Sequence, residues 1–265
     1  PHLQQTHAWA VQSGVQAWPI HLKLDTGMRR LGILPEEDAK AAALLAEGHL
    51  QLGTVMSHLA AADDEGHDAR TLDQLKAFAK RVSTHFDGTP CHILNTAGAA
   101  RAQAWLEGHP ELDFLRDTIR IGLGMYGLAP HATAHGLTPA LALTSVVSKL
   151  VDVPAGHGSG YGWTDAADHD RTLAVVSAGY ADGYPRSLGG GQAHVGWNGH
   201  LLPTVGRVCM DMMTVDVTGL EVHPGDAVTL WGGSPTLEGC AKQARTIPYE
   251  LLTRIGPRVQ RVSER

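Results

Sequence analysis

The chain has 265 residues, with 27 acidic and 21 basic side chains and a formal net charge of −6. This acidic balance disfavours binding to nucleic acid through a basic face, and the length allows one or two domains with a substantial core. No apolar run is long enough to suggest a membrane span, and the polar opening stretch does not resemble a signal peptide.

The cysteine and histidine patterns indicate neither a disulfide framework nor a metal site. The three cysteines, Cys91, Cys209 and Cys240, are odd in number and share no metal-like spacing. Reduced thiols in a cytoplasmic protein fit this pattern best. The 16 histidines are scattered without an HExxH pair, so the sequence predicts no bound metal.

Up to about residue 130, short apolar runs alternate with helical patterns. We expect strands over His21–Asp25, Leu52–Ser57, His92–Asn95 and Thr118–Ile121, and helices over Pro35–Glu47, around Leu72–Val82 and around Ala97–Glu107. This order is that of a parallel sheet. Four such units are half of a (β/α)8 barrel, and a small open sheet is the alternative.

Beyond Pro139 the pattern changes to runs rich in Val, Thr and Leu, separated by glycine-bearing turns. Strands are expected over Leu141–Val153, Leu173–Ser177, His194–Leu202, Met213–Val217 and Ala227–Leu230, and one late helix over Ala241–Leu252. The sequence therefore predicts an α/β domain over residues 1–137 and an all-β domain over residues 138–265.

Three turns of the second domain place tyrosines, an arginine and a Met-Asp pair between glycines. They are Ser159–Thr164, Gly179–Arg186 and Gly206–Met212. Glycine permits the positive φ angles and close backbone approaches that turns at a ligand site need. Each turn alone is more simply an ordinary hairpin connection.

Polar groups also follow the predicted strands of the first domain, where parallel barrels bind their ligands. These groups are the segment Asp25–Gly32, His58, Thr96 and the segment Arg120–Gly127. Singly, Thr96 could equally cap the next helix and His58 could be a hydrogen-bonded core residue. Arg120 lies within an apolar run, where a guanidinium needs an acidic partner or a ligand to offset its desolvation.

Together these motifs resemble those of the alanine racemases, over nearly the whole chain. Lys23–Gly32 is similar to the family's K-x-D-T-G-M-x-R-L-G, Arg120–Leu128 to its R-x-G-x-x-M-Y-G-L, and the three turns to motifs of its C-terminal domain. The resemblance implies a fold-type III enzyme that uses pyridoxal 5'-phosphate (PLP). The expected architecture is α/β plus all-β: the C-terminal half of a PLP-binding (β/α)8 TIM-type barrel, followed by a β-strand-rich C-terminal domain.

The resemblance also implies roles for residues of the first domain. Arg120 is similar to the arginine that faces the pyridine nitrogen of PLP. Because arginine stays protonated, it donates to that nitrogen, leaves it unprotonated and limits the carbanion's lifetime. Thr96, Gly122 and Leu123 resemble the phosphate-binding residues, through one hydroxyl and two backbone amides.

Tyr161 resembles one of the two catalytic bases that racemisation needs on opposite faces of the substrate's Cα atom. An ordinary tyrosine titrates near pH 10, so it needs a neighbour that favours the phenolate. His58, backed by Arg120, is similar to the residue that does this in the family. A turn tyrosine without a chemical role is the alternative.

The substrate site implied by the resemblance comprises Arg30, Met210 and Asp211, with Met210 acting through its backbone amide. Lys23 matches a lysine that is carbamylated in many relatives, and Tyr180 a residue at the entrance. In the family, Tyr161, Tyr180 and Met210 reach the cofactor of the other subunit, which implies a homodimer with shared active sites. Asp182 and Arg186 are expected to stabilise their turn.

One element of the family pattern is absent from the sequence. PLP enzymes hold their cofactor through a lysine Schiff base, which the family places in a motif like V-K-A-x-A-Y-G-H-G. The six lysines, Lys23, Lys40, Lys76, Lys80, Lys149 and Lys242, lie in other contexts. We therefore expect an N-terminally incomplete chain that is inactive alone. Two smaller departures are Arg29 in place of a common glycine and Thr96 in place of serine.

The resemblance implies an isomerase that interconverts L- and D-alanine on a PLP aldimine with two bases, a lysine and a tyrosine. It would supply D-alanine for peptidoglycan in the cytoplasm, without nucleic-acid or membrane partners. Two alternatives remain open: a broad-specificity amino-acid racemase of the same fold, and a non-catalytic module that has lost the chemistry.

Overall fold

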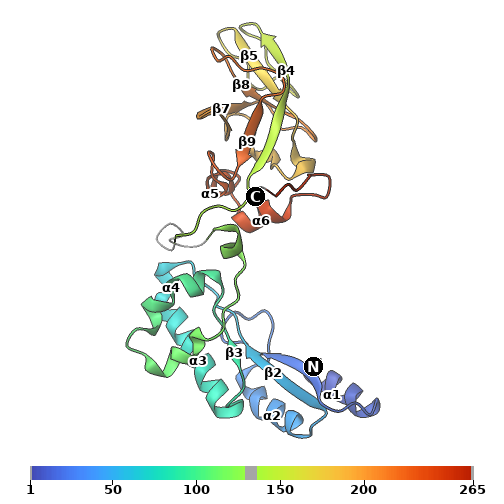
Figure 1. The fold of residues 1–265 in the computed structure, drawn as a ribbon, viewed down its shortest axis with the longest axis vertical. Helices are drawn as coiled ribbons and strands as arrows, with labels where there is room; N and C mark the ends of the chain where they lie inside the picture. The colour runs from blue at the N-terminus through green and yellow to red at the C-terminus, as the bar shows by residue number, and fades with distance from the viewer. Residues whose placement is uncertain (1, 129–135, 264–265) are drawn as a thin grey trace. The chain divides into compact units, whose positions relative to one another are not determined.

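The computed structural model describes residues 2–128 and 136–263. The chain divides into two compact units, Pro1–Thr138 and Pro139–Arg265. Helices and strands alternate in the first, whereas strands dominate the second (Figure 1).

The first unit is a parallel β/α structure. Strands β1 (Trp18–Lys23), β2 (Leu50–Met56) and β3 (Cys91–His92) form a parallel sheet in that order. The helices are α1 (His2–Gln12), α2 (Asp38–Ala46), α3 (Asp68–His85) and α4 (Thr96–Leu106), with 3₁₀ turns η1 (Pro35–Glu37), η2 (Glu65–His67), η3 (Pro110–Arg116) and η4 (Leu123–Tyr126). Val55 of β2 and Leu75 and Phe78 of α3 are fully buried in the core, so the apolar stripe predicted on α3 faces the sheet.

The predicted fourth strand, Thr118–Ile121, is wrong in extent. Only one residue of it pairs: Arg120 forms an isolated parallel bridge with Asn95, and its amide donates to Leu94 O at 2.9 Å. Ile119 and Ile121 are 44 % and 40 % exposed, so the apolar alternation that suggested a strand does not mark a buried face here. The helix α1 was not predicted, because only His7 and Ala10 of its residues are buried and its apolar periodicity is weak.

The second unit is a closed antiparallel barrel of six strands in the order β4-β5-β8-β7-β6-β9. The strands are β4 (Leu143–Val153), β5 (Arg171–Val176), β6 (His194–Trp197), β7 (His200–Val205), β8 (Met213–Asp216) and β9 (Ala227–Trp231). Leu173, Val195 and Val215 are fully buried, consistent with inward-facing residues of a small barrel.

Two predicted elements of this unit are divided in the structure. The run His194–Leu202 is a hairpin, because Asn198 and Gly199 turn the chain with φ angles of 45° and 82°, the geometry that Asn-Gly favours. The single late helix is two helices, α5 (Leu237–Gln243) and α6 (Pro248–Thr253). Arg245, at φ 57°, and Pro248 separate them, since proline cannot continue a helix across its own position.

Within the described ranges, no helix is both long and apolar enough to cross a bilayer. The same residues contain no cluster of three or more His, Cys, Asp or Glu side chains that could hold a metal ion. The three cysteines are free thiols. Burial raises the pKa of Cys91 and of Cys240 to about 11, whereas Cys209 is partly exposed.

Candidate active site

The guanidinium of Arg120 is the centre of the polar groups at the carboxyl ends of the sheet. It donates to Ser57 O at 2.8 Å and to His92 O at 3.2 Å, and it contacts Nδ1 of His58 at 3.0 Å and Nδ1 of His92. No carboxylate pairs with Arg120 among the residues that the structure describes. Its partners are therefore carbonyls and imidazoles, which leave its positive charge uncompensated.

The hydrogen bond from Arg120 fixes the tautomer of His58. Arginine has no acceptor, so Nδ1 of His58 must accept and a neutral imidazole then carries its proton on Nε2. Burial and the charges of Arg120, Lys23 and Arg30 lower the pKa of His58, which keeps the ring neutral near pH 7. The outcome is a histidine whose Nε2–H group can donate to another group.

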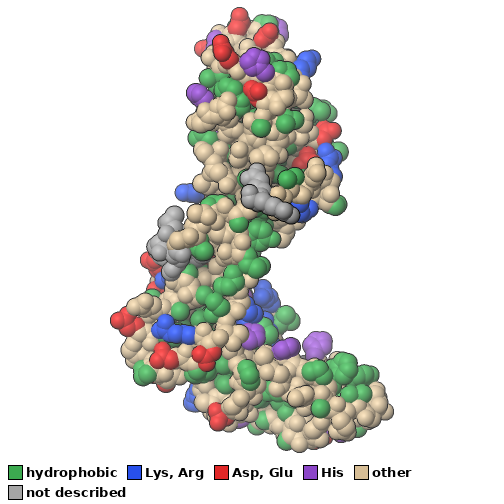
Figure 2. Space-filling model, viewed as in Figure 1, with side chains coloured by type: hydrophobic (Ala, Val, Ile, Leu, Met, Phe, Trp, Pro, Cys, Tyr) green, Lys and Arg blue, Asp and Glu red, His purple; other side chains and the backbone are tan. Residues whose placement is uncertain are grey.

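His92 was missed by the sequence analysis as a site residue. Burial first, and then Arg120 and His21, lower the pKa of His92, so it too is a neutral acceptor beside Arg120. Figure 2 shows histidine and basic side chains lying side by side on the first unit. The available signal was its place at a strand end, at the same edge as His58 and Arg120.

Thr96 lies at the start of α4 and is buried, and its hydroxyl joins α4 to the segment after Arg120. Thr96 Oγ1 accepts from the amide of Gly122 at 2.9 Å and from that of Gly124 at 3.3 Å. The helix cap is Asn95, whose Oδ1 accepts from Gly98 N at 2.8 Å. The interpretation of Thr96 as a cap is therefore wrong. Leu123 begins η4 and is half-buried.

The segment Asp25–Ile33 is a closed loop at the end of β1. Its base is fastened by backbone bonds from Asp25 N to Ile33 O and from Ile33 N to Lys23 O, at 2.9 and 2.8 Å. Asp25 Oδ1 accepts from Gly27 N at 2.8 Å and Arg29 N at 3.1 Å. Although burial alone would raise the pKa of Asp25, backbone hydrogen bonds lower it below its usual value.

Two predicted site residues belong to this part of the first unit. Arg30 is exposed on the loop, and Lys23 is half-buried at the end of β1. Burial, followed by the charges of Arg30 and Arg120, lowers the pKa of Lys23. Arg29 adopts a left-handed φ of 53°, a conformation that glycine adopts without strain.

In the second unit, Tyr161 lies on the long loop between β4 and β5 and is 71 % exposed. Gly160 and Gly162 beside it have φ angles of 67° and 83°. Asp165 Oδ1 accepts from Ser159 N at 3.1 Å, and Arg171 Nη2 donates to Asp165 O at 2.6 Å. These bonds hold the two sides of the loop around Tyr161.

Tyr180 and Met210 are brought together by the backbone. Tyr180 N donates to Cys209 O at 3.0 Å, and Ala181 N donates to Met210 O at 2.9 Å. A Cβ atom on Gly179 would lie 2.3 Å from Cys209 O, so this approach requires glycine. Tyr180, Met210 and Asp211 are all exposed there.

Asp182 stabilises this turn, as predicted. Its Oδ2 accepts from Gly179 N at 2.9 Å, and its Oδ1 lies 2.7 Å from Nε of Arg258. The predicted site residues thus form two groups. Lys23, Arg30, His58, Thr96, Arg120, Gly122 and Leu123 belong to the first unit, and Tyr161, Tyr180, Met210 and Asp211 to the second.

Family models match both units of the chain. "Alanine racemase, N-terminal domain" covers residues 1–130, and "Alanine racemase, C-terminal domain" covers residues 140–263. Among curated proteins, "Alanine racemase 3" of Salmonella typhi is 36 % identical over 250 residues, covering 94 % of this chain and 65 % of that protein. The alanine racemase of Beutenbergia cavernae is 39 % identical over 271 residues, with 96 % and 68 % covered. The chain thus spans about two thirds of these relatives' length.

Solved structures give the same result. The alanine racemase of D-cycloserine-producing Streptomyces lavendulae is 35 % identical with a TM-score of 0.82, and the match covers 97 % of this chain and 69 % of that one. The alanine racemase of Bartonella henselae, a structure with covalently bound pyridoxal phosphate, is 30 % identical with a TM-score of 0.84, covering 98 % and 70 %. The predicted fold, part of a TIM-type barrel followed by a β domain, is confirmed. With both its units matched, the chain belongs to the alanine racemase family.

Proposed function

We propose that the protein carrying this chain is an alanine racemase, a PLP-dependent isomerase that interconverts L- and D-alanine. The observation that supports this most directly is the half-buried guanidinium of Arg120, which faces carbonyls and two imidazoles instead of a carboxylate. A purely structural arginine is normally paired when it is taken out of water. Arg120 therefore has the character of a group kept for a ligand.

The donor set of the first unit fits PLP. Arg120 would hold the pyridine nitrogen, and the Thr96 hydroxyl with the Gly122 and Leu123 amides would hold the phosphate near the start of α4. The Gly122 amide, which donates to Thr96 Oγ1 in this structure, would then donate to the phosphate instead. A Cβ atom on Gly122 would meet nothing within 4 Å, whereas one on Gly124 would lie 2.9 Å from Ile121 Cγ2 and 3.1 Å from Thr96 Cγ2. The backbone beside Thr96 is thus open at Gly122 and closely packed at Gly124, which suits a phosphate cradle.

When bound, PLP withdraws electrons from the substrate's Cα atom and makes its proton acidic. The residues of this chain supply the substrate-binding groups and one of the two bases, and the lysine that is the second base is not among them. Arg30 binds the substrate carboxylate, and the Met210 amide and Asp211 are further groups for the substrate. Tyr161 Oη of one subunit accepts or returns the Cα proton on one face, and the Nε2–H group of His58 of the other subunit stabilises the phenolate form by donating to it.

Lys23 is proposed to be carbamylated and to position Arg30. Its lowered pKa increases the fraction of neutral amine, which is the form that reacts with carbon dioxide. We further propose a cytoplasmic homodimer in which Tyr161, Tyr180 and Met210 complete the site of the other subunit. Its product, D-alanine, would serve peptidoglycan synthesis.

The test uses the product of the complete open reading frame that encodes this chain, loaded with PLP. Chiral chromatography should detect D-alanine formed from L-alanine, and Tyr161→Phe should lower kcat by about 100-fold or more, the loss expected for a general base. Tyr249→Phe, on an exposed tyrosine of α6, is the matched control and should retain activity. Absence of racemisation by the PLP-loaded protein, or full activity in Tyr161→Phe, would overturn the proposal.

The 265 residues alone are expected to be inactive, because they contain no lysine in a V-K-A-x-A-Y-G-H-G motif. The isolated chain should bind PLP without racemising alanine, and Arg120→Ala should weaken that binding, measured by PLP absorbance in equilibrium dialysis. D-alanine formation by the isolated chain would contradict this expectation.

A further inference from the structure

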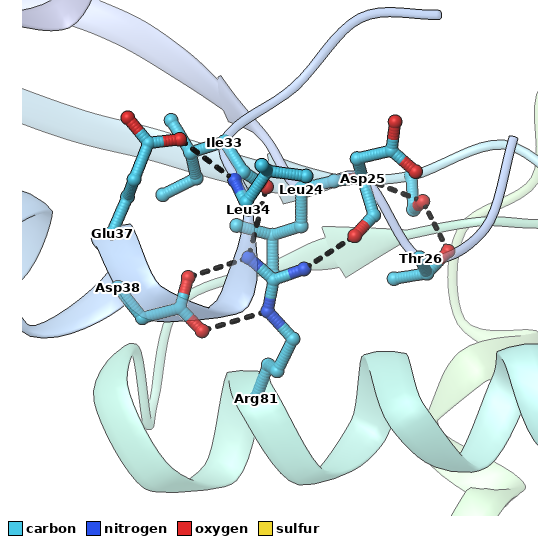
Figure 3. Close-up of polar contacts among 9 residues, drawn as sticks. Leu24, Asp25, Thr26, Ile33, Leu34, Glu37, Asp38 and Arg81 are labelled. Carbon is cyan, nitrogen blue, oxygen red and sulfur yellow. Dashed lines mark hydrogen bonds and ion pairs between the residues drawn. The ribbon is translucent and has the colours of Figure 1, made fainter. Parts of the chain in front are cut away.

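Arg81 of α3 is a buried arginine that the proposed chemistry does not use. It is 8 % exposed, and its guanidinium makes four hydrogen bonds (Figure 3). Two go to the carboxylate of Asp38, at 2.7 Å from Nε and 2.6 Å from Nη2. The other two go to the backbone carbonyls of Asp25 and Ile33, at 2.6 and 3.0 Å.

These two carbonyls are the first and last of the loop Asp25–Ile33. One planar guanidinium therefore joins both ends of the loop, and the carboxylate of Asp38, itself only 2 % exposed, holds that guanidinium in orientation. Such paired, charge-assisted bonds fix geometry as well as adding energy. Lysine could keep the charge but could not reach the carboxylate and both carbonyls from one ammonium group.

The same loop has a second set of polar contacts, at Thr26. Thr26 Oγ1 lies 2.7 Å from Ser57 Oγ and accepts from Gln74 Nε2 at 3.0 Å. Gln74 and Arg81 are both on α3, two turns apart. Side chains of α3 thus bond to the first two residues of the loop and to its last residue. The exposed Arg30 lies between these points along the chain.

We propose that Arg81, oriented by Asp38, is a positioning residue that fixes the loop Asp25–Ile33 and so places Arg30 for the carboxylate of the amino-acid substrate. The inference rests on the proposed function for the role of Arg30. The first part of the proposal, that Arg81 fixes the loop, does not depend on PLP or on activity. A carboxylate receptor that is already ordered binds without losing conformational entropy at that moment.

The chain offers a matched control in Arg101 of α4. Arg101 is equally buried at 8 %, and it pairs with the carboxylate of Asp68 at 2.8 and 2.9 Å and with one carbonyl, Ala62 O, at 3.0 Å. None of its partners lies in the loop Asp25–Ile33. Arg101→Lys should therefore disturb packing much as Arg81→Lys does, without acting on the loop.

The first experiment is hydrogen exchange with mass spectrometry on the isolated chain, without PLP. Arg81→Lys should increase exchange at the loop amides of Gly27, Arg29 and Ile33 by about tenfold or more, the factor that corresponds to 1.4 kcal/mol. Arg101→Lys should leave these amides protected. Unchanged loop exchange in Arg81→Lys, or an equal increase in both variants, would overturn the proposal. If Arg81→Lys does not fold, Asp38→Asn removes the orienting charge and takes its place.

The second experiment measures kinetics on the complete, PLP-loaded protein. Arg81→Lys should raise KM for L-alanine by about tenfold to a hundredfold with kcat changed far less, because a misplaced carboxylate receptor weakens ground and transition states alike. Arg101→Lys should keep the original KM. An unchanged KM in an active Arg81→Lys enzyme would overturn the positioning role. If the parent enzyme shows no racemisation, the proposed function fails, and the exchange experiment still decides whether Arg81 fixes the loop.

Discussion

Two of the loops to which we assign substrate chemistry, those of Arg30 and Tyr161, are held in different ways. The loop Asp25–Ile33 of the first unit is tied at both ends by Arg81, whose carboxylate partner comes from a separate helix. The loop over residues 154–170 of the second unit is also contacted by a buried arginine, Arg171. Arg171, however, bonds to Asp165 within the loop, and its Nε has no partner among the described residues.

The loop Asp25–Ile33 is therefore fixed by bonds within its own unit, whereas the loop over residues 154–170 is fixed by fewer bonds to residues outside it. In the second loop, Tyr161 and Trp163 are 71 % and 77 % exposed, and the backbone bond between Trp163 N and Gly160 O is long at 3.4 Å. A receptor for a fixed group such as a carboxylate gains from order in the free protein. A residue that completes the site of another subunit, as we propose for Tyr161, can obtain its order from that contact instead.

Removing the two arginines should give the largest contrast between the loops. Arg81→Met leaves Asp38 buried without its partner, so we expect a loss of about 3–5 kcal/mol in the free energy of unfolding. Arg171→Met should cost about 1–3 kcal/mol, because it removes one short bond, to Asp165 O at 2.6 Å, and only a long contact of 3.5 Å to the carboxylate. Urea unfolding followed by tryptophan fluorescence measures both. An equal loss in the two variants would remove the distinction between the loops.

Glycine substitutions should sharpen the contrast at the level of backbone. Gly32 has a φ of 121°, and a Cβ atom on it would lie 2.6 Å from Asp25 N, whereas one on Gly160 would meet nothing within 4 Å. Gly32→Ala should therefore destabilise by about 2 kcal/mol or more, and Gly160→Ala by about 1 kcal/mol, the strain of a left-handed alanine alone. Thermal unfolding of the two variants tests this order, and a smaller effect at Gly32 would contradict it.

Acid should weaken the first unit through His58 and His92. Burial and Arg120 lower the pKa of each histidine in the folded state, while an unfolded histidine titrates near pH 6.5. Below about pH 6.5 the unfolded chain therefore binds protons that the folded chain does not, so stability falls as the pH falls from 7 toward 5. Urea unfolding at several pH values measures the slope. The double variant His58→Gln, His92→Gln should flatten it, and an unchanged slope would exclude these histidines as its cause.

The smallest expected effect concerns Arg29. Its left-handed φ of 53° is strained for a residue with a Cβ atom and free for glycine. Arg29→Gly should raise the free energy of unfolding by up to about 1 kcal/mol, since relief of strain exceeds the added entropy of the unfolded chain. A loss of stability in this variant, measured by urea unfolding, would show that the Arg29 side chain has contacts that matter more.

The fold was predictable where periodicity and turn chemistry agree. The stripe of α3 and the strands β4, β5, β8 and β9 follow from patterns of apolar residues that burial confirms. The strand expected at Thr118–Ile121 is not one, because a single backbone bond joins it to the residues after β3. Pairing depends on the partner segment, and a single stretch of sequence does not contain that information.

The sequence motifs predicted most residues of the candidate site, but they did not predict all of the contacts that these residues make. The partnership of Arg120 with His58 followed from family resemblance, and the structure brings the two side chains together. Arg81 lies in a helix without a motif, so nothing in its local sequence marked it, and the one signal for His92 was its place at a strand end. Their importance comes from contacts 28 to 56 residues away along the chain.

The contrast between the three thiols has a practical consequence for reagents. The thiolate is the reactive form of cysteine, and with pKa values of about 11 Cys91 and Cys240 will hold almost none of it at neutral pH. A maleimide dye added to the native protein should therefore label Cys209 first. That single dye would be attached to the residue whose carbonyl accepts from Tyr180 N, next to Met210. Its fluorescence there would report ligand entry or subunit association.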